Sequence, residues 1–546
     1  MPTRLLLIAI ATLVAGGAAA QTAVSVSPSA VRERANQTLD YYQLQEDLTR
    51  TEAAASEEPA TTVTPVEEPS EPSPPDGAVR FRVERVVTDP SAILSASEIT
   101  AIASELEGRI VGIDELQAAV RHLNELYRVK GYATARALLP PQRVQEGTVR
   151  IQLIEARVGE VRLEGIEHTS KGFVTRRLDA APGELVELGR LEADLVRFNR
   201  LYDVELRATV EPGAVFGTTD YVIKAREPSN SDASVYVDNA GRDEIGLERA
   251  GFLYSNLSVA GFRDRLDLGG QYADDTLAGF IAYSLPVNRS GTRISLSYDY
   301  SRIEIGSGPL ADFDVDGDSW DAGALVIHPL LPRPRLRVDA YGGFDRKRST
   351  TRFADVGSLS TSLATARAGF ELRAADRSGV WYLHPAWTTG FEDFGGDRSF
   401  SRCNLSIHRL QHLGGRLAAL LRLGGQWSDT DLLPASEQFQ LGGVATVRGF
   451  DEGVLLGDSG YFVSAELQWR WFDGRLTTTL FTDHGGAFSV ASPDERADHL
   501  TSGGVGLLVD LSRWFTARLG FGVPLGHSPG IDDEPTLHFL VQSRPL

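Results

Sequence analysis

The fold is decided by the stretch Arg293-Ile294-Ser295-Leu296-Ser297-Tyr298-Asp299-Tyr300, in which polar and apolar side chains alternate. A period of two is typical of a strand with one face in an apolar environment and the other in water. The pattern recurs at Leu417, Ala419, Leu421 and Leu423, set against Arg416 and Arg422, and at Leu336, Val338 and Ala340, set against Arg335, Arg337 and Asp339. It predicts a series of strands that are each apolar on one face.

The extent of this pattern separates two architectures. A soluble sandwich shows the same alternation, but here segments of roughly ten residues, divided by Gly, Asp and Ser turns, continue from about residue 232 to 546. That is too much sheet for one sandwich and favours a transmembrane β-barrel of about 16 antiparallel strands. Aromatic residues near the expected strand ends would suit the girdles of a membrane protein or an ordinary core: Tyr461, Trp469, Trp471, Phe472 and Trp514.

The N-terminus predicts export from the cytoplasm. A basic start, Met1 to Arg4, is followed by an apolar run, Leu5 to Val14, and by Ala18-Ala19-Ala20 before Gln21. This order is that of a secretory signal peptide over residues 1–20. No later stretch has the ~18 apolar residues of a membrane-spanning helix, so a membrane role would have to come from strands.

Composition argues against several other classes of function. The net charge of −20 disfavours nucleic-acid binding, and the single cysteine, Cys403, excludes an intramolecular disulfide framework and a cysteine metal cluster. We find no phosphate-binding loop and no zinc motif, and we expect neither cofactor nor metal. His484 follows Asp483, but neighbouring strand residues point to opposite faces, so we expect no catalytic pair and no enzyme.

Two segments separate the signal from the folded parts. Residues 21–54 contain a stretch without helix breakers, from 30 to 54, which predicts a helix. Its low apolar content means that this helix either is solvated or rests in a polar cavity. Residues 55–77 form a linker rich in Pro, Glu, Ser and Thr, which we expect to be extended and unable to pack, with prolines at Pro69, Pro72, Pro74 and Pro75.

Residues 78–228 predict two similar α/β modules. The first, 78–157, has strands at 79–87, 132–139 and 148–155 and helices at 96–106 and 113–129. The second, 158–228, repeats this order, with strands at 160–164, 204–210 and 219–225 and helices near 171–178 and 188–201. Such modules could add a strand from an extended client chain at an open sheet edge, or could serve only as rigid spacers.

The whole order of parts resembles the two-partner secretion transporters, the TpsB family of ShlB/FhaC/HecB-type haemolysin secretion/activation proteins, within the superfamily of POTRA-containing outer-membrane barrels. The resemblance is carried by four short motifs: Leu153 to Gly159, Val237-Asp238-Asn239, Tyr283-Ser284-Leu285-Pro286, and Phe439 to Gly443 leading into Val447-Arg448-Gly449-Phe450. It implies two POTRA domains, the first of the ShlB type, an N-terminal plug helix and a barrel over residues 229–546.

The resemblance also implies a charge pair that we call the loop lock, made of Arg448 and Asp483. Arg448 would lie at the tip of a loop of about 430–458 that folds into the barrel from outside, and Asp483 belongs to Phe481-Thr482-Asp483-His484-Gly485 on a strand. A guanidinium in a confined lumen is stabilised by a fixed carboxylate. Gly449 would allow the turn and Gly485 would make room for the loop. The supporting residues are Val447, Gly449, Phe450, Phe481 and Gly485.

The function implied is secretion of a large haemolysin-like or adhesin-like exoprotein across the outer membrane without ATP, with the POTRA domains in the periplasm. Outer-membrane lipids and the barrel assembly machinery would be further partners. The closing strand is expected to end near Ser543, with assembly recognition resting on Phe539 and Val541, because Pro545 cannot continue a ladder. Two alternatives remain open at this point: an assembly factor of the same superfamily and a passive porin.

Overall fold

The computed structural model describes residues 27–34, 36–38, 41, 48, 63–64, 80–308, 311, 314–353, 357–488, 498–526, 531 and 534–544. The expected signal peptide and most of the expected linker lie outside these residues. The chain forms two compact units, one of residues 1–58 with 229–546 and one of residues 59–228.

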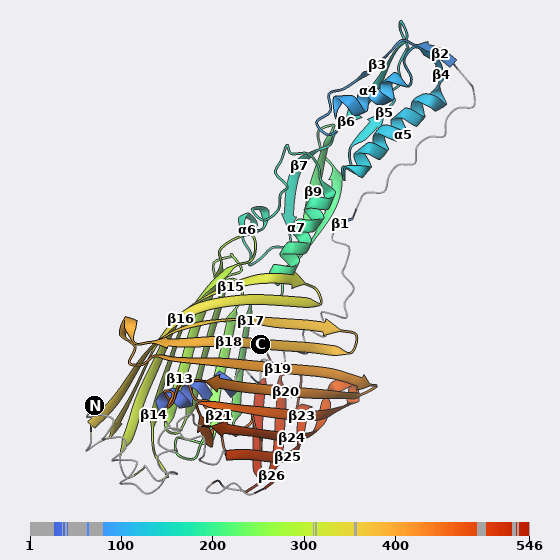
Figure 1. Cartoon of the computed structure of the whole chain (residues 1–546). Coiled ribbons are helices and arrows are strands. Elements are labelled where there is room, and N and C mark those ends of the chain that lie inside the picture. Colours follow the sequence, from blue (N-terminus) through green and yellow to red (C-terminus); the bar gives the residue numbers. More distant parts are fainter. Residues whose placement is uncertain are drawn as a thin grey trace. The chain divides into compact units, whose positions relative to one another are not determined.

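The larger unit is a closed barrel of sixteen antiparallel strands, as the sequence predicted (Figure 1). Each strand pairs with the next barrel strand along the chain, and β27 returns to pair with β10. The strands are β10 (Ser231–Asp238), β11 (Arg249–Asn256), β12 (Arg265–Ala273), β13 (Thr276–Pro286), β14 (Arg293–Glu304), β15 (Val315–Arg333), β16 (Leu336–Phe353), β17 (Gly357–Asp376), β18 (Gly379–Phe391), β19 (Phe400–Gly414), β20 (Leu417–Ser428), β23 (Ser459–Trp471), β24 (Leu476–Phe488), β25 (Asp498–Asp510), β26 (Phe515–Pro524) and β27 (Thr536–Ser543).

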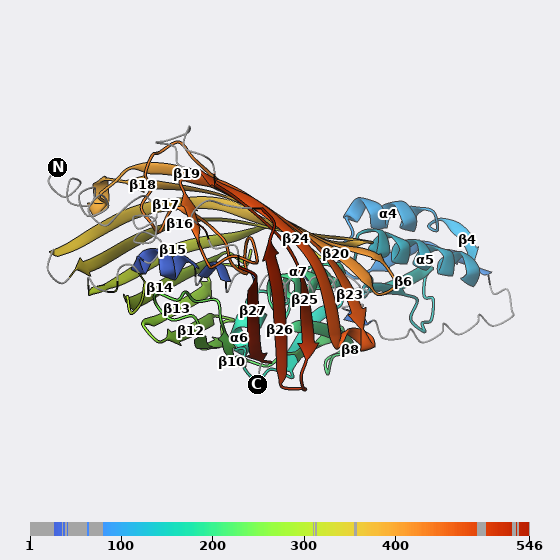
Figure 2. The same cartoon turned by 90° about the horizontal axis from the view of Figure 1, so that it is seen from below.

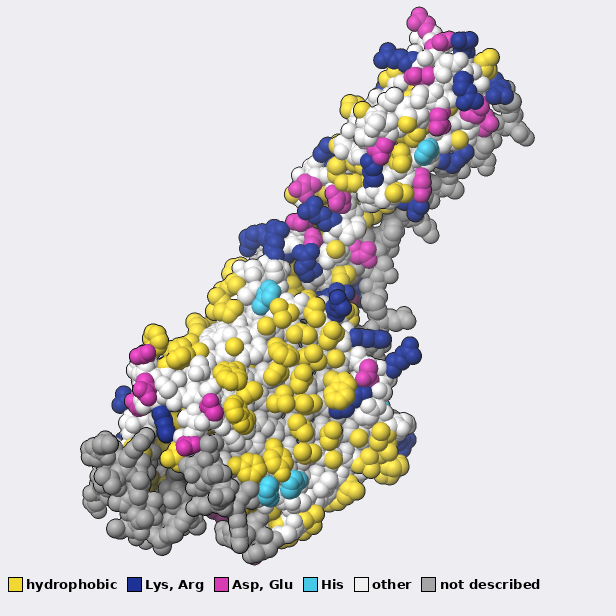
Figure 3. Space-filling model, in the orientation of Figure 1, with side chains coloured by type: hydrophobic (Ala, Val, Ile, Leu, Met, Phe, Trp, Pro, Cys, Tyr) yellow, Lys and Arg dark blue, Asp and Glu magenta, His cyan; other side chains and the backbone are white. Residues whose placement is uncertain are grey.

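The outer face of the barrel is apolar. Ile294, Leu296, Tyr298 and Tyr300 of β14 are all exposed, whereas Ser301 is fully buried on the luminal side. Figure 3 shows hydrophobic side chains spread over the visible face of the barrel, with few charged ones among them. No helix within the described residues is long and apolar enough to cross a membrane. The alternation in the sequence therefore separates a lipid-facing surface from a polar lumen.

The order of the strands shows at which end of the barrel each connection lies. We call the end at which β10 begins the inner end and the opposite end the outer end. Because β20 is the eleventh barrel strand, the connection after it, residues 429–458, lies at the outer end. The turn after β23, which includes the short helix η3 (Phe472–Gly474), lies at the inner end. Of the aromatic residues for which a girdle and a core position were both left open, four are exposed near inner-end turns: Trp469, Trp471, Phe472 and Trp514.

The seam that closes the barrel is short. β10 and β27 share three residue pairs, Tyr236 with Gln542, Val237 with Val541 and Asp238 with Leu540. The Asn239 side chain extends the seam, because its Nδ2 donates to Leu537 O at 2.6 Å and its Oδ1 accepts from Phe539 N at 2.7 Å. β27 ends at Ser543, as expected.

The first module of the smaller unit contains β2 (Arg80–Val83), β3 (Arg85–Thr88), α4 (Ala96–Ser104), β4 (Arg109–Gly112), α5 (Ile113–Val129), β5 (Arg136–Leu138) and β6 (Thr148–Ile154). The single strand expected over 79–87 was wrong: it is divided at Glu84, because β2 pairs with β4 while β3 pairs with β6. β4 was not predicted, and the strand expected over 132–139 is shortened to β5. α5 has the predicted bounds and buries Leu116, Leu123 and Tyr127 in the module core.

The second module contains β7 (Arg157–Glu164), α6 (Lys171–Thr175), α7 (Leu188–Leu201), β8 (Glu205–Pro212) and β9 (Thr218–Arg226). Phe173, Phe198 and Tyr202 pack ring against ring in its core. Its sheet has the order β1-β8-β9-β7, in which β1 (Val63–Thr64) comes from the expected linker. The expectation that the linker cannot pack was therefore wrong at these two residues.

Candidate functional site

The outer-end connection between β20 and β23 folds into the barrel. Its two short strands, β21 (Phe439–Leu441) and β22 (Leu455–Gly457), pair with each other to form a hairpin. The loop then buries an apolar cluster together with the barrel wall: Phe439, Leu441, Val447, Phe450 and Leu455 from the loop, and Phe462, Ala487 and Leu500 from the strands. Burial of these side chains holds the loop against β23, β24 and β25.

Arg448 and Asp483 are in direct contact. Arg448 Nε lies 2.8 Å from Asp483 Oδ2 and Nη2 lies 2.8 Å from Asp483 Oδ1, and the Arg448 backbone N–H also donates to Oδ2 at 3.1 Å. Both side chains are buried, with 7% and 0% exposure. This is the paired-fork geometry in which an arginine binds a carboxylate most strongly.

A second carboxylate, which sequence reasoning missed, shares the same arginine. Arg448 Nη1 lies 2.8 Å from Glu466 Oε1, and Nη2 lies 3.2 Å from Ser464 Oγ. The guanidinium carbon also stacks 3.6 Å from the centroid of the Phe481 ring. Arg448 belongs to the loop and not to a strand. Its burial lowers its pKa, but the neighbouring carboxylates Glu466 and Asp483 have a larger, opposite effect and hold that pKa above its ordinary value. The arginine is therefore charged and satisfied on several sides.

Glycines allow the loop to approach the wall closely. Gly449 has φ +91°, and a Cβ there would come within 2.9 Å of Gly522 C on β26. A Cβ on Gly485 would come within 2.6 Å of Tyr461 O and 2.7 Å of Leu441 Cδ1. A side chain at Gly449 or at Gly485 would thus clash with its surroundings, and Gly522, which faces Gly449, was not named from the sequence.

His484 does not join Asp483 in a reactive pair. Its Nε2 lies 3.1 Å from Tyr461 Oη and its Nδ1 lies 2.8 Å from Thr501 Oγ1. Asp483 instead faces Arg448. Among the described residues, no group of His, Cys, Asp or Glu has the arrangement of a metal site.

An N-terminal helical segment, residues 28–34 and 36–38, lies inside the ring of strands (Figures 1 and 2). It contacts the wall through Pro28 O, which accepts from Ser301 Oγ at 3.0 Å. It also contacts the inward loop, since Arg34 Nε donates to Gln440 Oε1 at 3.2 Å and Gln440 Nε2 donates to Ala30 O at 3.1 Å. Of the two environments left open for this helix, the structure has the polar cavity.

A chain of charges runs from this helix through the wall to the loop. Arg32 of the helix lies 3.7 Å from Asp321 of β15, and Lys347 of β16 lies 3.5 Å from the same carboxylate. Lys347 also lies 3.0 Å from Glu437 of the loop, which in turn pairs with Arg402 of β19 at 2.8 Å. These five residues, which we call the charge relay, were not predicted from sequence.

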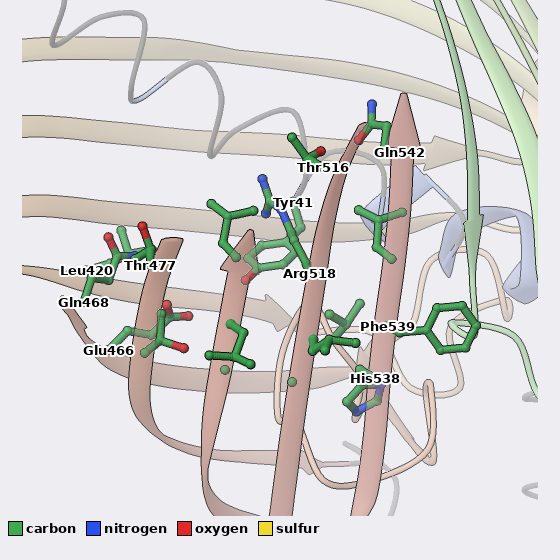
Figure 4. Close-up of a pocket in the computed structure, with 18 of the residues that line it drawn as sticks. Tyr41, Leu420, Glu466, Gln468, Thr477, Thr516, Arg518, His538, Phe539 and Gln542 are labelled. Atoms are coloured by element: carbon green, nitrogen blue, oxygen red, sulfur yellow. The ribbon is translucent and has the colours of Figure 1, made fainter. Parts of the chain in front are cut away.

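Arg448 borders a cavity inside the barrel. This cavity of about 690 Å³ lies along β23 to β27, and polar side chains on its wall include Glu466, Gln468, Arg518 and Gln542 (Figure 4). Tyr41, a residue of the N-terminal region, also borders this cavity. The loop tip therefore lies beside a cavity whose wall carries both polar and apolar side chains.

Comparison with known proteins places the chain among secretion transporters. The family model "Haemolysin secretion/activation protein ShlB/FhaC/HecB" matches residues 217–509, and the model "POTRA domain, ShlB-type" matches residues 81–156. The heme/hemopexin transporter protein HuxB of Haemophilus influenzae is 26% identical over 74% of this chain and 73% of its own length. The outer membrane transporter CdiB of Escherichia coli is 25% identical over 81% of this chain and 77% of its own length.

Solved structures share the fold. CdiB from Escherichia coli superposes with a TM-score of 0.64 at 21% identity, covering 95% of this chain and 99% of that one. BamA from Haemophilus ducreyi, without its first three POTRA domains, gives 0.56 at 14% identity over 85% of this chain and all of that one. Because the family model covers more than half of the sequence, the chain belongs to the haemolysin secretion/activation protein family ShlB/FhaC/HecB, the outer-membrane transporters of two-partner secretion.

Proposed function

We propose that this protein secretes a large, unfolded exoprotein of the haemolysin or adhesin type across the outer membrane, without ATP. The POTRA domains of this family lie in the periplasm, and there they would bind the client by strand addition. The barrel would supply the path through the membrane. HuxB is named as a heme/hemopexin transporter, CdiB as an outer membrane transporter and ShlB as a hemolysin transporter, and the client of this chain would be a secreted protein.

The observation that supports this proposal most is the way the lumen is filled. The N-terminal helix is held by buried polar contacts, such as Arg32 with Asp321 and Arg34 with Gln440, and by one small apolar cluster around Val31. The inward loop, by contrast, adds a larger apolar cluster to its ion pair with Asp483. Polar contacts can be exchanged for contacts with water or with a passing chain at low cost, whereas a large apolar interface cannot. A filling of this kind suits a path that opens when a client arrives.

In this proposal the loop lock keeps the loop tip fixed while the helix leaves. Arg448 and Asp483 are buried and share two side-chain hydrogen bonds, and Glu466 binds the same arginine with a second carboxylate. Among the described residues, the ion pair of the helix is longer, since Arg32 lies 3.7 Å from Asp321. An extended client would therefore displace the helix first and pass along the polar wall beside the loop.

The test is secretion of a large exoprotein encoded beside this gene, measured in culture medium at matched outer-membrane levels of each transporter. The variants are Arg448→Ala, Asp483→Ala and a deletion of residues 30–54. Arg337→Ala is a matched control, because Arg337 pairs with Asp339 at an exposed site on β16. We expect the intact chain and the control to secrete and the two lock variants to lose secretion.

Two other outcomes would point to other functions. If the exoprotein leaves the cell without this chain while other barrels fail to assemble, the protein is an assembly factor. If the intact chain gives steady conductance and secretes no partner protein, it is a passive porin. Either result contradicts the proposal, because in neither case does the barrel transport the exoprotein.

A further inference from the structure

The outward face of the barrel becomes basic towards the outer end of β16. The outward-facing positions of β16 carry no polar side chain from Leu336 to Phe344, a span of nine residues that begins at the inner end. A transmembrane strand crosses the hydrocarbon core with ~9–11 residues, whereas β16 has 18 residues and its neighbours β15 and β17 are of similar length (Figure 2). The next two outward positions, Arg346 and Arg348, therefore follow directly after the lipid-facing band. We call them the outer arginine pair.

The direction of the outer arginine pair is set by the residue between them. Lys347 points into the lumen, where its Nζ lies 3.0 Å from Glu437 Oε1 of the inward loop. Because neighbouring strand residues face opposite sides of a sheet, Arg346 and Arg348 point away from the lumen. Arg348 is exposed, and so is Phe344, which lies on the same face. The pair thus faces the membrane and not the inside of the barrel.

Aromatic rings border the outer arginine pair. Trp320 of β15 lies opposite Arg348 in the strand pairing. The Phe344 ring packs edge to face against the Phe394 ring, with centroids 6.3 Å apart, and Phe394 is 77% exposed. Phe394 belongs to the outer-end connection after β18, and its carbonyl oxygen accepts a hydrogen bond from Arg346 Nη1. Exposed rings beside cationic groups are typical of the level at which acyl chains meet lipid head groups.

The outer arginine pair binds neutral groups of the protein. Among the described residues, Arg346 donates to the Phe394 carbonyl, and Arg348 Nε donates to Ser360 Oγ at 3.2 Å. Neither of these partners carries a charge, so the contacts orient the two guanidinium groups without neutralising them. Both groups keep further N–H donors for an anion.

The other charged residues of this face lie further out and are close to balanced. Arg352 of β16 binds Asp316 at 2.5 Å and also binds Asp318. On β14, Arg302 lies opposite Asp318 and Glu304 lies opposite Asp316. These five residues carry two positive and three negative charges, so the positive charge of the face is concentrated in the outer arginine pair. The carboxylates beyond the pair would keep an anion at its level.

We propose that the outer arginine pair binds a phosphate group of the phosphorylated glycolipid in the outer leaflet of the outer membrane. A guanidinium group can hold a phosphate with two parallel hydrogen bonds. The two arginines are ~7 Å apart along one strand, so their long side chains can close on one phosphate from both sides. Phe344 would lie against the acyl chains of the same lipid.

The position of the pair favours the lipid over a free anion. A phosphate ion would contact the arginines alone, whereas the glycolipid also covers the exposed rings of Phe344 and Phe394. The lipid-facing band brings that head group to the pair without a search through solution. This inference concerns the outside of the barrel and goes beyond the proposed function, so its failure would leave the secretion proposal untouched.

The first experiment measures binding of the glycolipid to the purified full-length protein in detergent. The probe is fluorescently labelled lipopolysaccharide that lacks its outer sugars. We expect Arg346→Gln combined with Arg348→Gln to weaken binding at least tenfold. The matched control, Arg333→Gln combined with Arg335→Gln, removes two exposed arginines at the inner-end turn between β15 and β16 and should bind like the unaltered protein. Equal affinities for the two double variants would overturn the proposal.

The second experiment changes the ligand, so that the result does not depend on how well a variant folds. Dephosphorylated glycolipid should bind the unaltered protein at least tenfold more weakly than the phosphorylated form, and inorganic phosphate in large excess should not displace the labelled probe. Equal binding of the two glycolipids would show that only apolar contacts matter and would overturn the proposal. Displacement by inorganic phosphate would reduce the site to one for simple anions and would overturn it as well.

Discussion

Lys347 Nζ lies 3.0 Å from Glu437 Oε1 and 3.5 Å from Asp321 Oδ2. One ammonium group of the barrel wall therefore contacts both Glu437 of the inward loop and Asp321, the carboxylate that binds the N-terminal helix. Glu437 also pairs with Arg402, and Asp321 also pairs with Arg32. Within the described residues, loss of the helix would leave Asp321 with Lys347 as its ion-pair partner. The charge relay therefore gives the loop and the helix a shared electrostatic partner.

Replacement of this shared partner should loosen both attachments. In Lys347→Met, Glu437 keeps Arg402 and Asp321 keeps Arg32, so the cost lies below the about 3–5 kcal/mol expected for complete loss of a buried ion-pair partner. We expect more frequent channel openings in planar bilayers than for the unaltered protein. Arg337→Met, at an exposed pair on the same strand, is the control and should leave the openings unchanged. Equal opening frequencies for the two variants would contradict a coupling role.

The two carboxylates that bind Arg448 should contribute unequally to holding the loop. Asp483 accepts two side-chain bonds and a backbone bond from Arg448, whereas Glu466 accepts one. We expect Asp483→Asn to raise hydrogen exchange at residues 447–450 more than Glu466→Gln does. Arg448→Lys should resemble Asp483→Asn although it keeps the charge, because an ammonium group cannot form the fork.

The same exchange experiment contains its own control. Glu371→Gln removes a carboxylate from an ion pair with Arg373 on another part of the barrel, and it should leave residues 447–450 protected. If Arg448→Lys leaves those amides as protected as in the unaltered chain, the paired hydrogen bonds of the arginine are not required and its positive charge alone holds the loop.

The sequence predicted the barrel and the contact of Arg448 with Asp483, but not the surrounding charges. The period of two marks which residues face the lumen, and a family motif marks Arg448. Glu466 and Lys347 look like any other luminal residue of a strand, because their importance comes from strand register and from a loop distant in sequence. Ion pairs between residues that are distant in the sequence and meet only in the folded barrel cannot be predicted from a local sequence pattern.

In the smaller unit, too, only the elements with a clear sequence pattern could be predicted. The helix α5 was predicted with its bounds, because its apolar residues recur at helical spacing over several turns. β4 and β1 were missed, because strands of four and two residues are too short to show a period. The short β1 is formed by its partner, since the edge of β8 supplies the hydrogen bonds that the linker sequence alone cannot.

Gly449 should tolerate no side chain. Gly449→Ala would place a Cβ 2.9 Å from Gly522 C and hold alanine at φ +91°, so we expect a loss of about 1–3 kcal/mol from the docked loop. The loop would then be cut by protease at lower concentrations. Gly520→Ala on the same strand as Gly522 is the control, since the nearest atom to its Cβ is 4.0 Å away. Equal protease resistance in both variants would show that the close approach is not required.

Acid should weaken one contact in the first module. Hydrogen bonds from Lys130 and Ser95 lower the pKa of Glu98 to about 2. A carboxyl with a depressed pKa stabilises the fold above its unfolded pKa, near 4.5, and this contribution is lost as the pH falls towards 2. We expect Glu98→Gln to lower the protection of the α4 amides at pH 7 and to match the unaltered chain near pH 2. A difference that persists at pH 2 would assign the effect to something other than the charge.

Asn239 should strengthen the seam of the barrel. It joins β10 to β27 through bonds to Leu537 O and from Phe539 N, next to a ladder of three residue pairs. In Asn239→Ala both backbone groups lose this partner, so we expect a cost of about 1–3 kcal/mol and faster hydrogen exchange at residues 540–542. Asn404→Ala removes a luminal hydrogen bond to Gln426 far from the seam and should leave those amides unchanged. Because the seam is the shortest strand pairing in the barrel, Asn239→Ala should also lower the temperature at which the folded barrel opens in detergent, and an unchanged temperature would mean that the ladder alone sets the strength of closure.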